Sequence, residues 1–298
     1  MSLTPFSLKN QLLEAYLKYF DTQYWLRDSL LMDERRSLLL KNSRLSSSIY
    51  LEPVLRFNSD ISFEALQPEL GLEEEICLQV KKSLFGEFNL RAHQAEALRV
   101  FFGKSDSKSN FVVTSGTGSG KTETFLFPIL LELAMEATTW NSQRAPHQWW
   151  NSQPPTWGAI RSGESRLPGV RTLLLYPTNA LVEDQMVRLR KSIRSINGLL
   201  KQRPVWFGRY TSSTPGSGDL PTRANLDEVR RRAAEIQEMC QEYDDFALSK
   251  PEIVDQLVDP RNGEMVTRWD MVSHAPDILV TNYSMLSAIM MRDLEIPL

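Results

Sequence analysis

The chain has 298 residues, enough for one large domain or two small ones, and its 42% of apolar and 24% of charged residues are typical of a soluble globular protein. Its net charge of −3 excludes a protein that binds nucleic acid through overall positive charge, so such binding would need local patches or backbone amides. The two cysteines are too few for a disulfide framework or a zinc cluster, which favours the reducing cytoplasm, and no apolar run is long enough to span a membrane.

Residues 1–83 are predicted to form a mainly helical N-terminal accessory segment. Within residues 7–20 the apolar side chains recur at helical spacing and would form one stripe, made of Leu8, Leu12, Ala15, Tyr16 and Tyr19. Proline and glycine residues then break the segment into short pieces. We interpret the segment as a helical layer that packs on the following domain, with a partner-docking arm as the alternative.

Residues 84–298 have the pattern of an α/β domain. Four short apolar runs, with helical patterns between most of them, lie at 110–114, 171–177, 204–208 and 277–282. Short apolar runs that alternate with helices are typical of a parallel sheet with helices on both faces. Each run alone is also compatible with a buried helix segment, but the neighbouring glycine and proline residues favour strands.

The first apolar run leads into the glycine-rich stretch TSGTGSGKTE, residues 114–123. Glycines let a loop wrap closely around an anion, and the amides at the start of the following helix point at that anion. Lys121 would reach the outer phosphates of a nucleotide, and the Thr122 hydroxyl would bind magnesium. The residues expected to bind the nucleotide here are Ser115, Gly116, Thr117, Gly118, Ser119, Gly120, Lys121, Thr122 and Glu123. The strict pattern has glycine at position 115, and a turn that binds nothing is the alternative.

The stretch FNLRAHQAEAL, residues 88–98, precedes this loop. The side-chain amide of Gln94 offers both a donor and an acceptor, as the edge of an adenine base requires. Arg91 or Phe88 would stack on the base. A solvated glutamine on a helix is the alternative, and the neighbouring phosphate loop favours the adenine site.

Residues 84–298 resemble the first RecA-like domain of the superfamily 2 helicases. Five stretches carry the resemblance, in the order of the family: LRAHQAEAL resembles the Q motif, SGTGSGKTE motif I, LLLYPTNALVEDQ motif Ia, GRYTSSTPG more loosely motif Ib, and PDILVTNYSML motif Ic. The family often carries serine at the position of Ser115. The resemblance implies a RecA-like P-loop sheet with helices on both faces, ATP and Mg²⁺ as cofactors, and helicase activity.

A narrower resemblance connects the chain to large bacterial helicases of phage defence, of the Druantia and DISARM kind. It rests on YWLRDSLLMDERR and YLEPVLRF near the N-terminus and on TRWDMVSHAPDILVTNYSML near residue 280. This resemblance implies a role in antiviral defence and favours DNA over RNA.

The family resemblance also implies contacts to single-stranded nucleic acid at the carboxyl ends of the strands. Loops at this edge of a parallel sheet present amides and small hydroxyls to ligands, and contacts to phosphates follow the strand without reading its sequence. The residues expected to make them are Pro177, Thr178, Asn179, Thr214, Gly216, Thr281, Asn282 and Ser284. The alternative is that these residues only cap helices.

An acid that orients the metal and the attacking water is missing from the expected place. The family carries it in a DE-x-x box at the end of a strand after motif Ic, and no such box follows Asn282 in this sequence. The acidic residues Asp33–Glu34, Asp227–Glu228 and Asp255 all precede motif Ic and have no strand before them. Since the strand with the box lies in the middle of the family's sheet, we expect the sheet to be incomplete.

We therefore expect residues 84–298 to be the N-terminal part of RecA-like domain 1 in a longer helicase. A second RecA-like domain with its arginine finger would follow in the same chain or come from a separate subunit. The 298 residues are expected to bind ATP without turning it over. A non-catalytic ATP-binding adaptor, which signals the nucleotide state to a partner, is the alternative function.

Two insertions complete the predicted domain. Residues 137–169 are expected to form a surface excursion whose tryptophans, Trp140, Trp149, Trp150 and Trp157, pack on the core or on missing domains. A platform that stacks bases is the alternative. Residues 217–270 include the basic helix EVRRRAAEIQE, read as a solvated face, with a DNA-backbone patch as the alternative.

Overall fold

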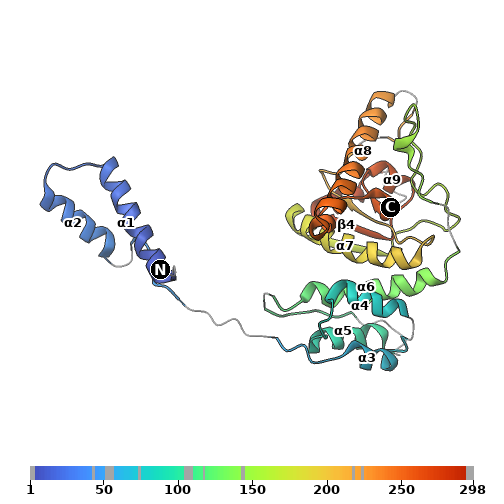
Figure 1. Ribbon diagram of the computed structural model, residues 1–298, viewed down its shortest axis with the longest axis horizontal. Helices are drawn as coiled ribbons and strands as arrows, with labels where there is room; N and C mark the ends of the chain where they lie inside the picture. Colours follow the sequence, from blue (N-terminus) through green and yellow to red (C-terminus); the bar gives the residue numbers. More distant parts are fainter. Residues whose placement is uncertain are drawn as a thin grey trace. The chain divides into compact units, whose positions relative to one another are not determined.

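The computed structural model describes residues 4–41, 44–50, 57–72, 75–103, 110–116, 118–141, 145–216, 219–222 and 225–292. The chain divides into two compact units, residues 1–56 and 57–298, which are described one at a time (Figure 1). The structure thus groups residues 57–83 with the α/β domain, whereas the sequence placed the boundary at residue 83.

The first unit contains two helices, α1 (Pro5–Gln23) and α2 (Ser29–Leu40). Thr4 and Ser7 form a capping box at the start of α1, and the Asp28 carboxylate caps α2. The carboxylate of Asp21 on α1 accepts hydrogen bonds from Arg35 and Arg36 of α2, at 2.5 and 2.6 Å. The predicted apolar stripe is largely exposed, with Leu8, Leu12, Tyr16 and Tyr19 between 40% and 62% accessible.

The second unit begins with a layer of four helices. They are α3 (Phe63–Leu70), α4 (Glu75–Phe85), α5 (Ala92–Phe102) and α6 (Lys121–Thr138). Helix α6 contacts both α4 and α5, and the Phe127 ring lies 5.0 Å from that of Phe63 and 5.1 Å from that of Phe85. This layer holds the phosphate loop, which leads into α6.

The sheet of the second unit has four parallel strands in the order β1-β4-β2-β3. The strands are β1 (Thr172–Tyr176), β2 (Phe207–Tyr210), β3 (Glu264–Met265) and β4 (Ile278–Asn282). The predicted strands at 171–177 and 277–282 are confirmed. The strand predicted at 204–208 begins three residues later, and the short β3 was not predicted.

The strand predicted at residues 110–114 is wrong. Residues 110–116 form no strand, and the Val112 side chain is 88% exposed. An apolar run becomes a strand only where a neighbouring strand and a half-buried face receive it, because strand preference reflects packing more than backbone preference. Within the described residues β1 is paired on one side only, with β4, so the sheet is incomplete, as expected.

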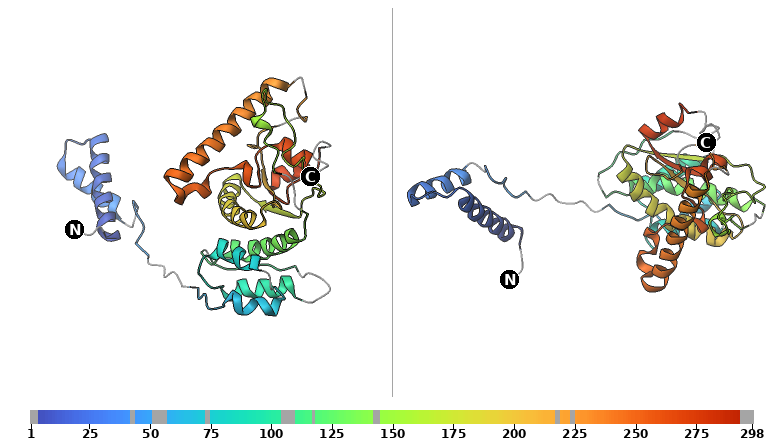
Figure 2. Two further views of the ribbon diagram at one scale, coloured as in Figure 1. Left: turned by 45° about the vertical axis from the view of Figure 1, so that its right-hand side comes forward. Right: turned by 90° about the horizontal axis from the view of Figure 1, so that it is seen from above.

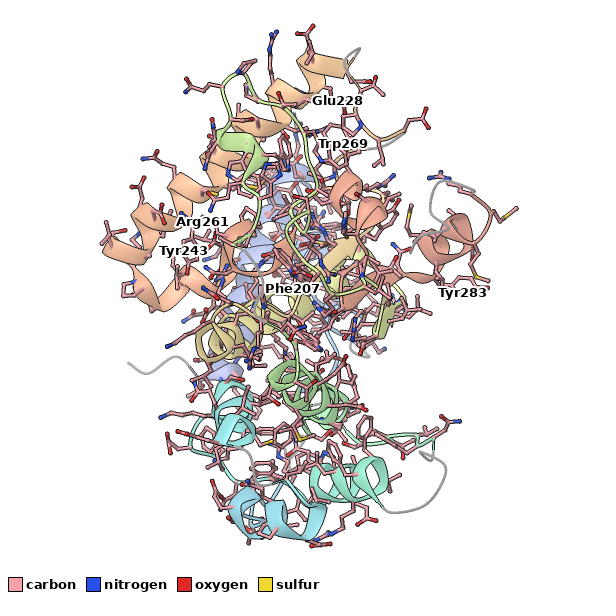
Figure 3. The ribbon with its side chains drawn as sticks, turned by 90° about the vertical axis from the view of Figure 1, so that its right-hand side faces the viewer. Phe207, Glu228, Tyr243, Arg261, Trp269 and Tyr283 are labelled. Carbon is pink, nitrogen blue, oxygen red and sulfur yellow. The ribbon has the colours of Figure 1, made fainter. Side chains whose placement is uncertain are left out.

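Helices cover both faces of this sheet, so the predicted α/β architecture is confirmed (Figures 1 and 2). Helix α7 (Asn179–Leu200) lies between the sheet and the α3–α6 layer. The other face carries the helices α8 (Leu226–Ser249), α9 (Arg268–Ser273) and α10 (Tyr283–Ile289). Along β4 the side chains alternate: Ile278 and Val280 belong to the α7-side core, and Leu279 to the α8-side core. Figure 3 labels Phe207 of the first core and Trp269 of the second.

The tryptophans of the 137–169 insertion pack inside the protein. Trp149 and Trp150 are 0% and 1% exposed and belong to the α8-side core, and Gln237 of α8 donates a 2.6 Å hydrogen bond to the Trp150 carbonyl. Trp140 is buried too, with the Arg166 guanidinium 3.7 Å from its ring centroid. The prediction that the tryptophans pack on the core is confirmed for Trp140, Trp149 and Trp150, which are too buried to stack bases. Trp157 is partly buried and packs against the α8-side core.

Helix α8 buries one narrow face and solvates the other. Its arginines pair within the helix, Arg230 with Asp227 at 3.3 Å and Arg232 with Glu235 at 2.6 Å, which agrees with the solvated-face interpretation. In the C-terminal half of α8, the ring of Tyr243 has the Arg261 guanidinium beside it, 5.6 Å from the ring centroid (Figure 3). No helix in the described part of the chain is long and apolar enough to cross a membrane.

A buried carboxylate joins the insertion to the sheet. Asp277, directly before β4, is 0% exposed and accepts hydrogen bonds from Arg166 at 3.0 Å, from Arg171 at 2.8 Å and from the Trp206 amide at 2.8 Å. It therefore links the insertion, the start of β1 and the segment that leads into β2.

Candidate nucleotide and nucleic-acid sites

The glycine-rich loop ends in a left-handed turn at the start of α6. Gly118 and Gly120 have φ values of 76° and 78°, a backbone conformation that side chains disfavour. A Cβ atom at Gly120 would also lie 2.5 Å from the Gln94 side-chain nitrogen. Both strain and space therefore require glycine at position 120. Thr117 lies outside the described residues.

Lys121 occupies the interior of this loop. Its ammonium donates hydrogen bonds to the carbonyl oxygens of Ser115 and Gly116, at 2.6 and 2.8 Å. The hydroxyls of Ser115 and Ser119 are hydrogen-bonded to each other. The loop thus presents oxygen acceptors to the Lys121 ammonium. Thr122 follows Lys121 in the first turn of α6.

Gln94 is joined to the phosphate loop rather than solvated. Its side chain is 4% exposed, its Oε1 accepts from the Arg91 amide at 2.9 Å, and its Nε2 donates to the Gly120 carbonyl at 3.1 Å. Arg91 reaches the same loop and donates to the Gly118 carbonyl at 2.8 Å. Adenine recognition by Gln94 stays a prediction, because both ends of its amide contact protein here.

Phe57 is a neighbour of the loop that the sequence did not indicate. The Arg91 guanidinium lies 5.2 Å from the centroid of the Phe57 ring, and a Cβ at Gly116 would lie 3.8 Å from that ring. Phe88, the aromatic residue considered from the sequence, is 77% exposed. Phe57 ends the stretch YLEPVLRF, which the sequence analysis singled out for the narrower resemblance and not for the nucleotide site.

The carboxyl ends of β1, β2 and β4 bring polar side chains together. Asn282, at the end of β4, donates through Nδ2 to Asn179 Oδ1 at 2.6 Å, and Asn179 donates to the Ser212 hydroxyl at 3.5 Å. The predicted residues Pro177, Thr178 and Ser284 are exposed at this edge. Three loops thus form one polar surface, to which Ser212 is an addition that the sequence prediction missed.

Two of the predicted contacts also cap helices, and their contact with nucleic acid stays a prediction. The Thr178 hydroxyl accepts from the Leu181 amide at 3.5 Å and caps α7, and Asn282 Oδ1 accepts from the Met285 amide at 2.7 Å and caps α10. Capping uses one acceptor of each side chain, and Thr178 is an exposed residue.

Two residues predicted to offer hydroxyls to nucleic acid are buried in this structure. Thr281 is 0% exposed and donates to the Tyr210 carbonyl at 2.6 Å. Thr214 is 4% exposed and donates to the Arg209 carbonyl at 2.7 Å. Both hydroxyls satisfy backbone carbonyls where β2 ends, which removes them from any ligand.

Gly216 is also turned inward. It has a φ of 83°, and a Cβ atom there would lie 3.1 Å from the Trp269 ring. Glycine at this position therefore allows the backbone to pack against Trp269. The exposed residues nearby are Ser213 in the same turn and Tyr283, which is 69% exposed beside Asn282 (Figure 3).

Charged and titratable groups surround the two sites. Glu123, expected to contact the nucleotide, forms an ion pair with Arg188 of α7. Burial raises the pKa of Tyr176, at the end of β1, to about 12, although Arg188 opposes this shift. Burial lowers the pKa of Arg209 on β2, and the charge of Glu264 opposes that shift.

The acidic pairs rejected from the sequence lie on helices. Asp33 is on α2 in the first unit, and Asp227 and Glu228 are in the first turn of α8. Asp255 lies in a 3₁₀ turn at Pro251–Gln256, with Arg194 3.8 Å away. None of these four follows a strand of the described sheet, in agreement with the sequence interpretation.

Comparison with known families agrees with this geometry. Residues 91–210, from the Arg91 beside the loop to the end of β2, match the DEAD/DEAH box helicase family. This match supports the resemblance to superfamily 2 helicases, and the parallel sheet with helices on both faces is consistent with a RecA-like fold. The matched region includes the phosphate loop, Gln94 and the loop after β1.

The chain is also similar to a curated protein. The chain is 29% identical over 327 residues to the Druantia protein DruE of Escherichia coli strain UMEA 4076-1, an alignment that covers 95% of this chain. The chain spans only 16% of the length of that relative. No solved structure matches the chain.

Proposed function

We propose that this chain is the ATP-binding lobe of a longer DNA helicase or translocase that acts in phage defence in the cytoplasm. The observation that carries the proposal is the Lys121 ammonium, which donates to the carbonyls of Ser115 and Gly116, next to Gly120, whose carbonyl accepts from Gln94. The similarity to the Druantia protein supports the defence role. The DNA substrate rests on the resemblance to phage-defence helicases described from the sequence.

The residues of the loop fit a magnesium–nucleotide. Lys121 would exchange the carbonyls of Ser115 and Gly116 for phosphate oxygens, which are stronger, charged acceptors. The free amides at the start of the 18-residue helix α6 favour the same anion. The described residues hold no group of three or more His, Cys, Asp or Glu that could bind a metal. Mg²⁺ would be held by the Thr122 hydroxyl and the phosphates, since this ion is usually bound through few protein ligands together with substrate phosphates.

Phe57 and Arg91 form a wall beside the loop that suits the base. Their contact at 5.2 Å leaves the guanidinium between an aromatic ring and the Gly118 carbonyl. Gln94 would form hydrogen bonds with the adenine edge after its hydrogen bond to the Gly120 carbonyl breaks. This arrangement supports recognition of ATP by shape and by the adenine edge.

We place single-stranded nucleic acid at the carboxyl edge of the sheet. The exposed groups there are hydroxyls and amides of Thr178, Asn179, Ser212, Asn282 and Ser284. Such neutral donors suit the phosphates of a single strand and carry no sequence preference. A second RecA-like domain, from the longer chain or a partner, would complete the helicase.

Replacing Lys121 by alanine tests the nucleotide site. Because a charge-assisted contact to phosphate contributes about 1.5–3 kcal/mol, the variant is expected to bind Mg-ATP more than tenfold more weakly in calorimetric titration. Lys82, an exposed lysine on α4, gives the matched control, and Lys82→Ala is expected to leave the affinity unchanged. Equal affinities of Lys121→Ala and wild type would show that the loop is not the site.

The affinity for single-stranded DNA is expected to fall as the salt concentration rises. Each phosphate that the protein neutralises releases counterions, but neutral donors release few, so we expect a shallow slope of log K against log salt. Fluorescence anisotropy with a labelled oligothymidine measures the slope, and a mixed-sequence oligonucleotide is the control. A salt-independent or strongly sequence-selective affinity would contradict this binding mode.

Measuring ATP turnover by the longer chain distinguishes the adaptor alternative from the helicase lobe. An adaptor would bind ATP and never turn it over, even when the following part of its own longer chain is present. A helicase lobe is expected to gain DNA-stimulated turnover in that longer chain.

A further inference from the structure

Helix α7 contacts both proposed sites. Its first residue, Asn179, belongs to the polar edge, where it is bonded to Asn282 and Ser212. Further along, Arg188 forms an ion pair with Glu123 in the first turn of α6, directly after the phosphate loop. Since a helix rises about 1.5 Å per residue, the two positions lie about 14 Å apart along one axis.

Glu123 stands close to the place where phosphates would bind. Its Oε2 would lie 3.4 Å from a Cβ atom at Gly120, the residue that closes the loop. A carboxylate beside a bound polyphosphate is repelled by it, and a cation that neutralises the carboxylate removes that repulsion. Arg188 is positioned to do so, and it also lies 3.9 Å from Asp184 of its own helix.

The remainder of α7 is held as a rigid element. Val182, Met186 and Leu189 are at most 1% exposed in the α7-side core. Arg190 forms a buried ion pair with Glu264 of β3, at 2.8 Å. A packed helix moves as a unit, so a change at Arg188 reaches Asn179.

We propose that Glu123 and Arg188 are positioning residues that couple phosphate binding in the loop to single-strand binding at the Asn179 edge. The inference rests on the proposed function, because it requires both ligands. When phosphates draw Lys121 away from the Ser115 and Gly116 carbonyls, the first turn of α6 shifts. The ion pair carries that shift to α7 and to the edge.

The quantity that tests this coupling is the ratio of two affinities. The affinity of the 298-residue chain for a labelled oligothymidine is measured with and without a saturating non-hydrolysable ATP analogue and Mg²⁺. An ion pair partly open to solvent supports a coupling of up to about fivefold in this ratio. The affinity for the analogue itself is measured in parallel and reports separately on the loop.

The variants form a double-mutant cycle. Glu123→Gln and Arg188→Gln are each expected to bring the ratio close to one, and the double variant is expected to do no more than either single one. Arg188→Lys keeps the charge and is expected to retain part of the coupling. Glu183→Gln is the matched control on the same helix, because Glu183 pairs with Arg209 of β2 and not with α6; its ratio is expected to equal that of wild type.

The outcomes separate the inference from the proposed function. If the wild type binds no ATP analogue or no oligonucleotide, the proposed function fails, and the coupling fails with it. If both ligands bind but the wild-type ratio is one, or if Glu123→Gln and Arg188→Gln keep the wild-type ratio, the positioning role alone is overturned. A loss of coupling in Glu183→Gln as well would assign the effect to the stability of α7 and would also overturn it.

Discussion

Replacing Asp277 by alanine is expected to lower the free energy of unfolding of the second unit by about 3 kcal/mol. Removing one partner of a buried ion pair costs about 3–5 kcal/mol, because the other charge stays buried without compensation. Asp277 is fully buried and neutralises Arg166, whose side chain is 9% exposed. Both arginines keep a second carboxylate, Arg166 the Glu164 side chain at 3.7 Å and Arg171 that of Glu136 at 2.9 Å, which places the effect at the lower end of the range.

Urea unfolding followed by tryptophan fluorescence measures this effect, since Trp140, Trp149, Trp150 and Trp206 are buried. Asp227→Ala is the matched control: the Asp227 side chain is fully exposed and pairs with Arg230 on the surface of α8. Its effect is expected to stay within about 0.5 kcal/mol. Equal unfolding midpoints for the two variants would mean that the Asp277 network does not hold the insertion to the sheet.

The strands illustrate how far the sequence predicts this fold. The apolar runs at β1 and β4 were located almost to the residue. The run at β4 is buried on both faces of the sheet, whereas β1 buries Leu174 and leaves Leu173 and Leu175 exposed. Strand β3 has two residues, Glu264 and Met265, and its glutamate is buried only because Arg190 of α7 pairs with it. A pairing between distant residues leaves no local pattern to find.

Residues 110–114 give the opposite lesson. Their apolar run is as clear as that of β1, yet they pair with no strand in the described structure. Periodicity indicates which residues prefer a sheet, and the presence of a neighbouring strand decides whether they join one.

The candidate sites divide in the same way. The spacing of glycines, Lys121 and Thr122 specifies a loop at a helix start, and the structure has that loop. The hydroxyls of Thr281 and Thr214 point inward because they donate hydrogen bonds to backbone carbonyls at the end of β2. A sequence motif does not encode the direction in which a side chain points. Phe57 and Arg188 reach the loop from distant segments, so only the fold reveals them.

The 298 residues alone are expected to bind ATP but to release phosphate at least about a thousandfold more slowly than a complete helicase. An arginine supplied from an opposite lobe contributes about 10³–10⁵ in rate where it has been isolated. A carboxylate that orients the metal and water is a further requirement, and no DE-x-x box follows Asn282 in these residues. Asp255, the nearest rejected acid before motif Ic, lies near Arg194 in a 3₁₀ turn.

Phosphate release in the presence of single-stranded DNA measures this prediction, with the 298 residues beside longer versions of the chain. A version that includes the DE-x-x strand is expected to be more stable thermally, because that strand would fill the sheet beside β1, which is paired with β4 only in the described structure. A version with the second lobe as well is expected to show DNA-stimulated turnover.

Lys121→Ala, made in each version, excludes contaminating enzymes. Turnover near ~1 per second by the 298 residues, abolished by Lys121→Ala, would mean that an acid already present serves the reaction, since complete phosphoryl-transfer enzymes work at about 1–100 per second. Asp255→Asn would then be the first variant to examine.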